Sequence, residues 1–118
     1  MEFFSVEQCL FGHAVTARVQ RTAGGISVLL TGGTHEHIGA VSVVLPEGEV
    51  QTMVFAAHRD DVISYIWADG LKAAGFSPAV IMVGIHYDGV NKEKIEQIIC
   101  CTNGMLQQVL ETMQKKAE

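Results

Sequence analysis

Histidine is the side chain with the most evident chemical capacity in this sequence, which contains five of them. His35 and His37 lie in a glycine-bracketed segment, His58 precedes an arginine and two acids, and His86 follows a long apolar run. Glycine-rich loops, helix starts and strand ends are places where folds present groups to ligands. Each histidine alone is compatible with a surface position, but together they favour function. We therefore expect His37, His58 and His86 to face a common cavity.

One chemistry open to several imidazoles is metal binding. His35 and His37 are two residues apart, so in an extended chain they point to the same side. Imidazoles with a carboxylate such as Glu36 are donors for zinc and other transition-series ions. The spacing matches no closed structural zinc motif. The sequence therefore offers His37, His58 and His86 as a candidate metal set and identifies no particular metal.

A second chemistry is phosphate binding by the segment Gly32, Gly33 and Thr34. Glycines leave backbone N–H groups open, and Arg59 at a helix start would supply a cation, so together they could hold a phosphate. The sequence contains no G-x-G-x-x-G motif after a strand and no Walker motif. The alternative interpretation is a hairpin turn that needs glycine for positive φ.

Other reactive groups give little support for an enzyme. No serine stands in a G-x-S-x-G context. Asp60 and Asp61 open a predicted helix, where acids complement the positive end of the helix dipole, and acid–base chemistry is the second interpretation. Cys9, Cys100 and Cys101 are an odd number without metal-type spacing, so we expect reduced thiols packed as small hydrophobic groups.

A sheet must position these residues, because the first half of the chain has the β-branched alternation of strands. Gly12 interrupts this pattern and is interpreted as a bulge. Gly32 and Gly33 are interpreted as a break after a strand. A near-continuous apolar run then suits a strand buried on both faces. The predicted strands are residues 3–10, 14–20, 26–31, 39–45, 50–55 and 79–85.

Two helices complete the predicted fold. Apolar residues at helical spacing, including Trp67, predict a helix from about His58 to Gly75. Asn91 is the expected N-cap of a final helix, in which Gly104 marks either a close packing contact or a bend. Strands first and helices late predict an α+β fold: a largely antiparallel sheet of five to six strands with both helices on one face. Such a sheet leaves edges or a face exposed, so we expect a homodimer.

Composition sets the broad class. The chain has 118 residues, of which 48% are hydrophobic, and a net charge of −5. This length predicts one domain, residues 1–118, and the negative charge argues against nucleic-acid binding. No run of apolar residues is long enough for a membrane span. Glu2 stands where a signal peptide would carry lysine, so we expect a cytoplasmic protein.

Four short motifs stand in this order in the sequence: Thr31-Gly32-Gly33, His37-Ile38-Gly39-Ala40-Val41, Ala57-His58-Arg59-Asp60-Asp61 and Gly84-Ile85-His86. Together they resemble the LpdD-like family, whose members are encoded beside UbiD-type decarboxylases. The resemblance covers about residues 10 to 112. It implies a fold similar to proteasome assembly chaperone 4, a dimer-forming sheet with two helices. It also implies a non-enzymatic chaperone that binds reduced prenylated FMN and helps to load it into a UbiD-type aromatic-acid decarboxylase.

The resemblance also implies which residues bind the cofactor. His35 falls in a variable part of the motif and is carried over with less weight. A divalent metal at His37, His58 and His86 would bridge the phosphate if one is present. Two other functions stay open: a small metal-dependent hydrolase or lyase that uses the same histidines, and a purely structural assembly subunit. The implied cofactor-binding residues are Gly32, Gly33, Thr34, His37, His58, Arg59 and His86.

Overall fold

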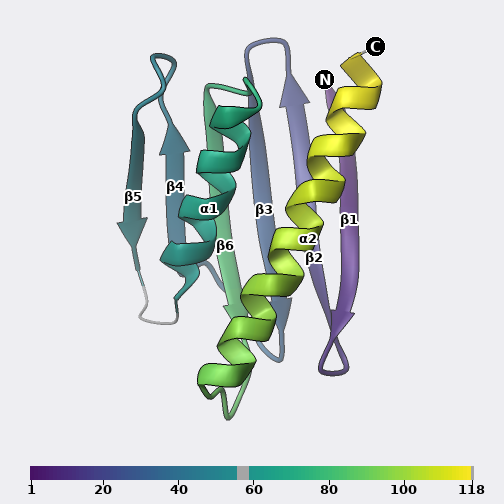
Figure 1. The fold of residues 1–118 in the computed structure, drawn as a ribbon, viewed down its shortest axis with the longest axis vertical. Helices are drawn as coiled ribbons and strands as arrows, with labels where there is room; N and C mark the ends of the chain where they lie inside the picture. Colours follow the sequence, from purple (N-terminus) through teal and green to yellow (C-terminus); the bar gives the residue numbers. More distant parts are fainter. Residues whose placement is uncertain (56–58, 118) are drawn as a thin grey trace.

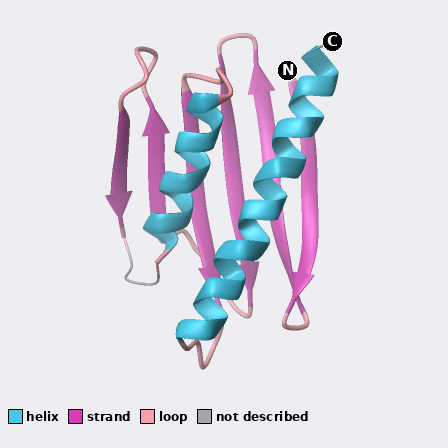
Figure 2. Ribbon diagram, in the orientation of Figure 1, coloured by secondary structure: helices cyan, strands magenta, loops and turns pink. Residues whose placement is uncertain are grey.

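The computed structural model describes residues 1–55 and 59–117. It contains one sheet with two helices on one of its faces, so the predicted α+β architecture is confirmed (Figures 1 and 2). None of the helices in these residues is long and apolar enough to cross a membrane. The elements are β1 (Glu2–Leu10), β2 (His13–Thr22), β3 (Gly25–Gly33), β4 (Ala40–Val44), β5 (Val50–Val54), α1 (Asp60–Ala73), β6 (Ala79–His86) and α2 (Lys92–Ala117).

The strand order in the sheet is β1-β2-β3-β6-β4-β5. Every neighbouring pair is antiparallel except β3 and β6, which run parallel at the centre. The carboxyl ends of β3 and β6 therefore lie at the same edge of the sheet. Both helices also begin at this end of the molecule, so their positive dipole ends lie there (Figure 1). The topology thus gathers two strand ends and two helix starts in one region.

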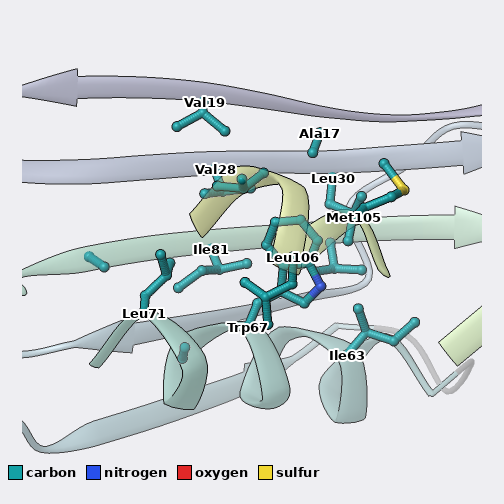
Figure 3. Close-up of a cluster of buried hydrophobic side chains, with 14 of the residues drawn as sticks. Ala17, Val19, Val28, Leu30, Ile63, Trp67, Leu71, Ile81, Met105 and Leu106 are labelled. Atoms are coloured by element: carbon teal, nitrogen blue, oxygen red, sulfur yellow. The ribbon is translucent and has the colours of Figure 1, made fainter. Parts of the chain in front are cut away.

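The hydrophobic core lies between the sheet and the helices, as the spacing of apolar residues predicts. Trp67 of α1 is fully buried among side chains that include Leu30, Ile81 and Leu106 (Figure 3). The two helices come close at Gly70, where an added Cβ would lie 2.8 Å from Cδ2 of Leu106.

The structure excludes one of the two interpretations of Gly104 and overturns the interpretation of Gly12. Gly104 would meet nothing within 4 Å with an added Cβ, so it makes no close packing contact. The prediction of a bulge at Gly12 is also wrong, because Phe11 and Gly12 form the turn between β1 and β2 with φ of 51° and 78°. Asn91 acts as expected, since its Oδ1 accepts a hydrogen bond from the backbone N–H of Lys94 at 2.8 Å.

The face of the sheet away from the helices carries large apolar side chains. Phe3 is 69% exposed and Met53 is 62% exposed. Leu29 and Met82 lie between them on the same face, where they line a shallow groove with Phe3. This open face leaves apolar surface outside the core.

The cysteines are free and less buried than expected. Cys9 and Cys100 are exposed, so they do not pack as small hydrophobic groups. Cys101 is partly buried against the core. Burial, with a smaller effect from Cys100, raises the pKa of the Cys101 thiol and keeps it protonated at neutral pH.

Candidate functional site

The loop of residues 34–39 is fastened to the end of β6. The backbone N–H of Thr34 donates to the carbonyl oxygen of His86 at 2.7 Å, and its hydroxyl donates to the same oxygen at 3.2 Å. At the other end of the loop, the N–H of Gly39 donates to the carbonyl of Val83 at 2.8 Å. The loop therefore follows β6 closely over its last residues.

Gly84 makes this close approach possible. A Cβ added at Gly84 would collide with the carbonyl oxygen of His37. Any other residue at this position would push the loop away from the sheet, together with the histidines that it carries.

Gly32 and Gly33 are the last residues of β3, so the prediction of a turn at this point is wrong. An added Cβ at Gly32 would lie 2.8 Å from the carbonyl oxygen of Ala14, and one at Gly33 would collide with that of His86. Gly33 also has a φ of +91°, which strongly favours glycine. These glycines therefore allow β2, β3 and β6 to pack at this edge, and the N–H of Thr34 is already donated within the protein.

Three imidazole rings gather beside this loop. The ring centroids of His37 and His86 are 5.9 Å apart, and the ring of His35 lies 6.4 Å from His37 and 6.2 Å from His86. Sequence reasoning gave little weight to His35, yet it joins the cluster. His13 lies elsewhere, with its ring 6.0 Å from that of Tyr87. His58 lies outside the described residues.

Asp60 connects the loop, β6 and α1. Its side chain is only 1% exposed. Its Oδ1 accepts a hydrogen bond from the backbone N–H of Ile85 at 3.3 Å, and its Oδ2 lies 3.4 Å from Nε2 of His37. Asp60 lies in the first turn of α1, as expected, and its buried carboxylate has contacts beyond the helix dipole.

A sequence signal for this role of Asp60 existed. Asp60, Ile63, Ser64 and Trp67 follow helical spacing, so the acid lies on the same face of α1 as the buried residues. An acid on the buried stripe of a helix needs a partner inside the protein, because an unpaired buried charge is costly. The spacing thus predicts that Asp60 is buried and that its neighbour Asp61 is not.

Arg59 precedes α1 in a left-handed conformation with a φ of 65°. Its carbonyl oxygen accepts from the backbone N–H of Val62 at 3.2 Å, while its side chain makes no capping hydrogen bond. The exposed guanidinium is therefore available at the rim of a cavity of about 180 Å³.

This cavity lies where the starts of α1 and α2 meet the end of β6. Its polar lining comes from Arg59, Asp60 and His86. The rest of its wall is apolar, apart from the phenol oxygen of Tyr87. The remaining lining residues are Ile63, Ile85, Tyr87, Val90, Ile95, Ile98 and Ile99. Such a site suits a ligand that combines an apolar ring with anionic or carbonyl groups.

A metal centre finds no complete donor set in the part of the chain that the structure describes. There, no group of three or more histidine, cysteine, aspartate or glutamate side chains is arranged to hold an ion. His37 and His86 belong to the predicted metal set, and its third member is His58, which these residues do not include.

Comparison with known proteins identifies relatives along almost the whole chain. Residues 10–114 match the profile of a family described as "Prenylated flavin chaperone LpdD-like domain". Protein LpdD of Lactiplantibacillus plantarum is 26% identical over 119 aligned residues, which cover 97% of this chain and 86% of that protein.

Proposed function

Because the chain belongs to the LpdD-like family of prenylated-flavin chaperones, we propose that it binds prenylated FMN and delivers it to a UbiD-type decarboxylase. In this proposal the protein is a carrier without catalytic turnover. The observation that supports it best is the placement of Arg59 and His86 at the rim of an apolar cavity, with the ring of His37 5.9 Å from that of His86.

The chemistry of these residues fits a flavin phosphate. The phosphate is an anion, and a guanidinium binds phosphate oxygens through charge-assisted hydrogen bonds. The two helix starts at this end of the molecule favour negative charge as well (Figure 1). The apolar part of the ligand would lie against the isoleucines of the cavity. Gly32, Gly33 and Thr34 would act by positioning the loop, and His58, next to Arg59 in the chain, is proposed as a further contact.

A carrier must also release its ligand. The cavity of about 180 Å³ is smaller than the drug-sized pockets of roughly 300–1,000 Å³ that bury most of a ligand. Much of a bound flavin would therefore remain outside it and accessible to a second protein. Partial burial with a few polar anchors limits affinity, which suits transfer to an apo-decarboxylase.

Replacing Arg59 by glycine is expected to weaken binding of prenylated FMN at least tenfold without destabilising the fold. Glycine tolerates a φ of 65° without the steric cost that other residues incur, and the Arg59 side chain makes no capping hydrogen bond. Isothermal titration with the reduced cofactor under anaerobic conditions measures the affinity, and urea denaturation measures the free energy of unfolding.

Two further variants serve as controls for this change. Arg59→Lys keeps the charge and should retain part of the affinity. Arg18→Ala removes a cation from the open face of the sheet, where Arg18 donates to Thr31, and should bind as the parent does. Equal affinity of Arg59→Gly and the parent would contradict the proposed role of Arg59.

Delivery is tested separately from binding. Apo-decarboxylase is mixed with the loaded protein, and its activity is compared with that obtained from the same amount of free cofactor. We expect faster activation by the loaded protein. Parallel samples with oxidised cofactor test whether the protein needs the reduced form that the resemblance implies. Samples with a chelator or an added divalent metal test whether binding depends on a metal ion. Failure to bind either form of prenylated FMN would refute the proposal.

We also propose that the chain forms a homodimer through its exposed apolar surface. The sheet ends at β5, so one edge of this strand faces away from its neighbour β4, and Met53 is largely exposed on it. Such edges favour pairing with another chain.

Met53→Lys is therefore expected to convert a dimer into a monomer, measured by sedimentation velocity. Gln51→Lys adds the same charge on the same strand without removing an apolar side chain, and should have a smaller effect. A parent protein that sediments as a monomer would contradict the proposal.

A further inference from the structure

We propose that the cavity between α1, β6 and α2 receives the additional, non-aromatic ring of prenylated FMN and so distinguishes it from FMN. This inference rests on the proposed function. It concerns a separate question, namely which part of the ligand the protein recognises.

The size of the cavity fits one ring. A cavity of roughly 150 Å³ lined by aliphatic and aromatic side chains holds a benzene molecule. The cavity here, about 180 Å³, can therefore hold one substituted six-membered ring but not the three fused rings of a flavin. The bound flavin must insert one edge only.

The lining selects which edge this is. Its apolar wall consists mainly of branched aliphatic side chains, such as Ile63, Ile95 and Ile98, which surround a puckered, methyl-bearing ring well. His86 and Tyr87 are the aromatic residues of the lining. The ring of Tyr87 already packs against Phe11 in an edge-to-face arrangement, with ring centroids 5.4 Å apart. The wall thus accommodates a branched, saturated ring, and the polar groups of the lining decide between the edges of the flavin.

The polar rim agrees with this orientation. Prenylation closes the fourth ring between N5 and the adjacent carbon of the dimethylbenzene ring, and N5 is next to the carbonyl-bearing edge of the pyrimidine ring. With the fourth ring in the cavity, that carbonyl would lie near Arg59, whose guanidinium can donate hydrogen bonds to it. The dimethylbenzene edge, by contrast, carries no polar group to meet them.

The cavity wall is held in place before any ligand binds. The hydroxyl of Tyr87 donates to the carbonyl oxygen of Leu10 at 2.7 Å. Burial, with smaller effects from Cys101 and Cys9, raises the pKa of this hydroxyl, so it remains a donor at neutral pH. A preformed wall discriminates between ligand shapes without a cost of ordering.

The experiment compares the affinities of reduced prenylated FMN and reduced FMN for three proteins. For the parent, we expect prenylated FMN to bind at least tenfold more tightly than FMN. Ile95→Phe fills the cavity and should reduce this ratio to about one by weakening only the binding of prenylated FMN. Leu110→Phe makes a similar enlargement on the same helix, away from the cavity lining, and should leave the ratio unchanged.

A second variant covers the case in which Ile95→Phe does not fold. Ile95→Ala enlarges the cavity and should weaken prenylated FMN several-fold while FMN binds as before. Equal affinity of the parent for the two flavins would overturn the inference and leave the proposed function intact. Parallel weakening of both flavins by the Ile95 variants would also overturn it, because another ring would then occupy the cavity. Absence of binding by either flavin would refute both proposals.

Discussion

Gly84→Ala is expected to abolish the binding site and to destabilise the protein by about 3 kcal/mol, the upper range for overpacking a well-packed interior. The added methyl group would collide with the carbonyl oxygen of His37, a backbone atom that cannot turn aside as a side chain can. The loop would have to leave β6 and break the hydrogen bond from Gly39 to Val83. We therefore expect affinity for prenylated FMN to fall more than tenfold.

Gly104→Ala is the matched control for this change. Gly104 lies within α2, and an added Cβ would meet nothing within 4 Å. Since alanine favours a helix over glycine by about 1 kcal/mol, this variant should be more stable than the parent and bind normally. Urea denaturation and ligand titration of both variants test the pair. A Gly84→Ala protein with the stability and affinity of the parent would show that the loop does not depend on this contact.

Asp60→Ala is expected to destabilise the protein by about 1–3 kcal/mol through the loss of one buried acceptor. The backbone N–H of Ile85 would lose its 3.3 Å partner on Oδ1, and His37 would lose the neighbouring carboxylate oxygen 3.4 Å away. Because Asp60 is the link between α1 and the loop, we also expect the loop to become more mobile and cofactor affinity to fall about tenfold.

Asp61→Ala is the control that distinguishes the loss of a buried acceptor from the loss of a negative charge near the start of α1. Both acids lie in the first turn of α1, but Asp61 is only partly buried. The hydroxyl of Ser64 donates a hydrogen bond to the backbone oxygen of Asp61, which the substitution leaves in place. Removing it should cost only about 0.3–1 kcal/mol, the usual contribution of a charge near a helix start. Asp60→Asn retains an acceptor for Ile85 and should fall between the two alanine variants. Equal losses for Asp60→Ala and Asp61→Ala would mean that Asp60 acts through the dipole alone.

Helical and strand periodicity made most of the fold predictable. The apolar stripe around Trp67 and the capping residue Asn91 are local patterns, and local patterns depend on few other parts of the chain. The same holds for the order of strands and helices, from which the α+β class follows. Local patterns failed where a contact from elsewhere decided the outcome, as at Gly32 and Gly33, which belong to β3.

The arrangement of the predicted site residues depends on contacts that the sequence did not reveal. The sequence pointed to His37, Arg59 and His86, and in the structure Arg59 and His86 line one cavity with the ring of His37 close to that of His86. It did not reveal the participation of His35, nor that Gly84 lets the loop lie close against β6. Both features depend on contacts between segments that are distant in the sequence.

The sequence by itself determined the elements, the buried stripes and the residues with chemical capacity, because each follows from the types and spacing of nearby residues. Only the tertiary structure decided that β3 and β6 run parallel and bring their carboxyl ends together. The same holds for the link that Asp60 makes to the Ile85 amide and for the isoleucine cavity beside Arg59. The physical reason is that these features join residues distant in the chain, and a pairing across such distances is selected by the packing of the whole molecule.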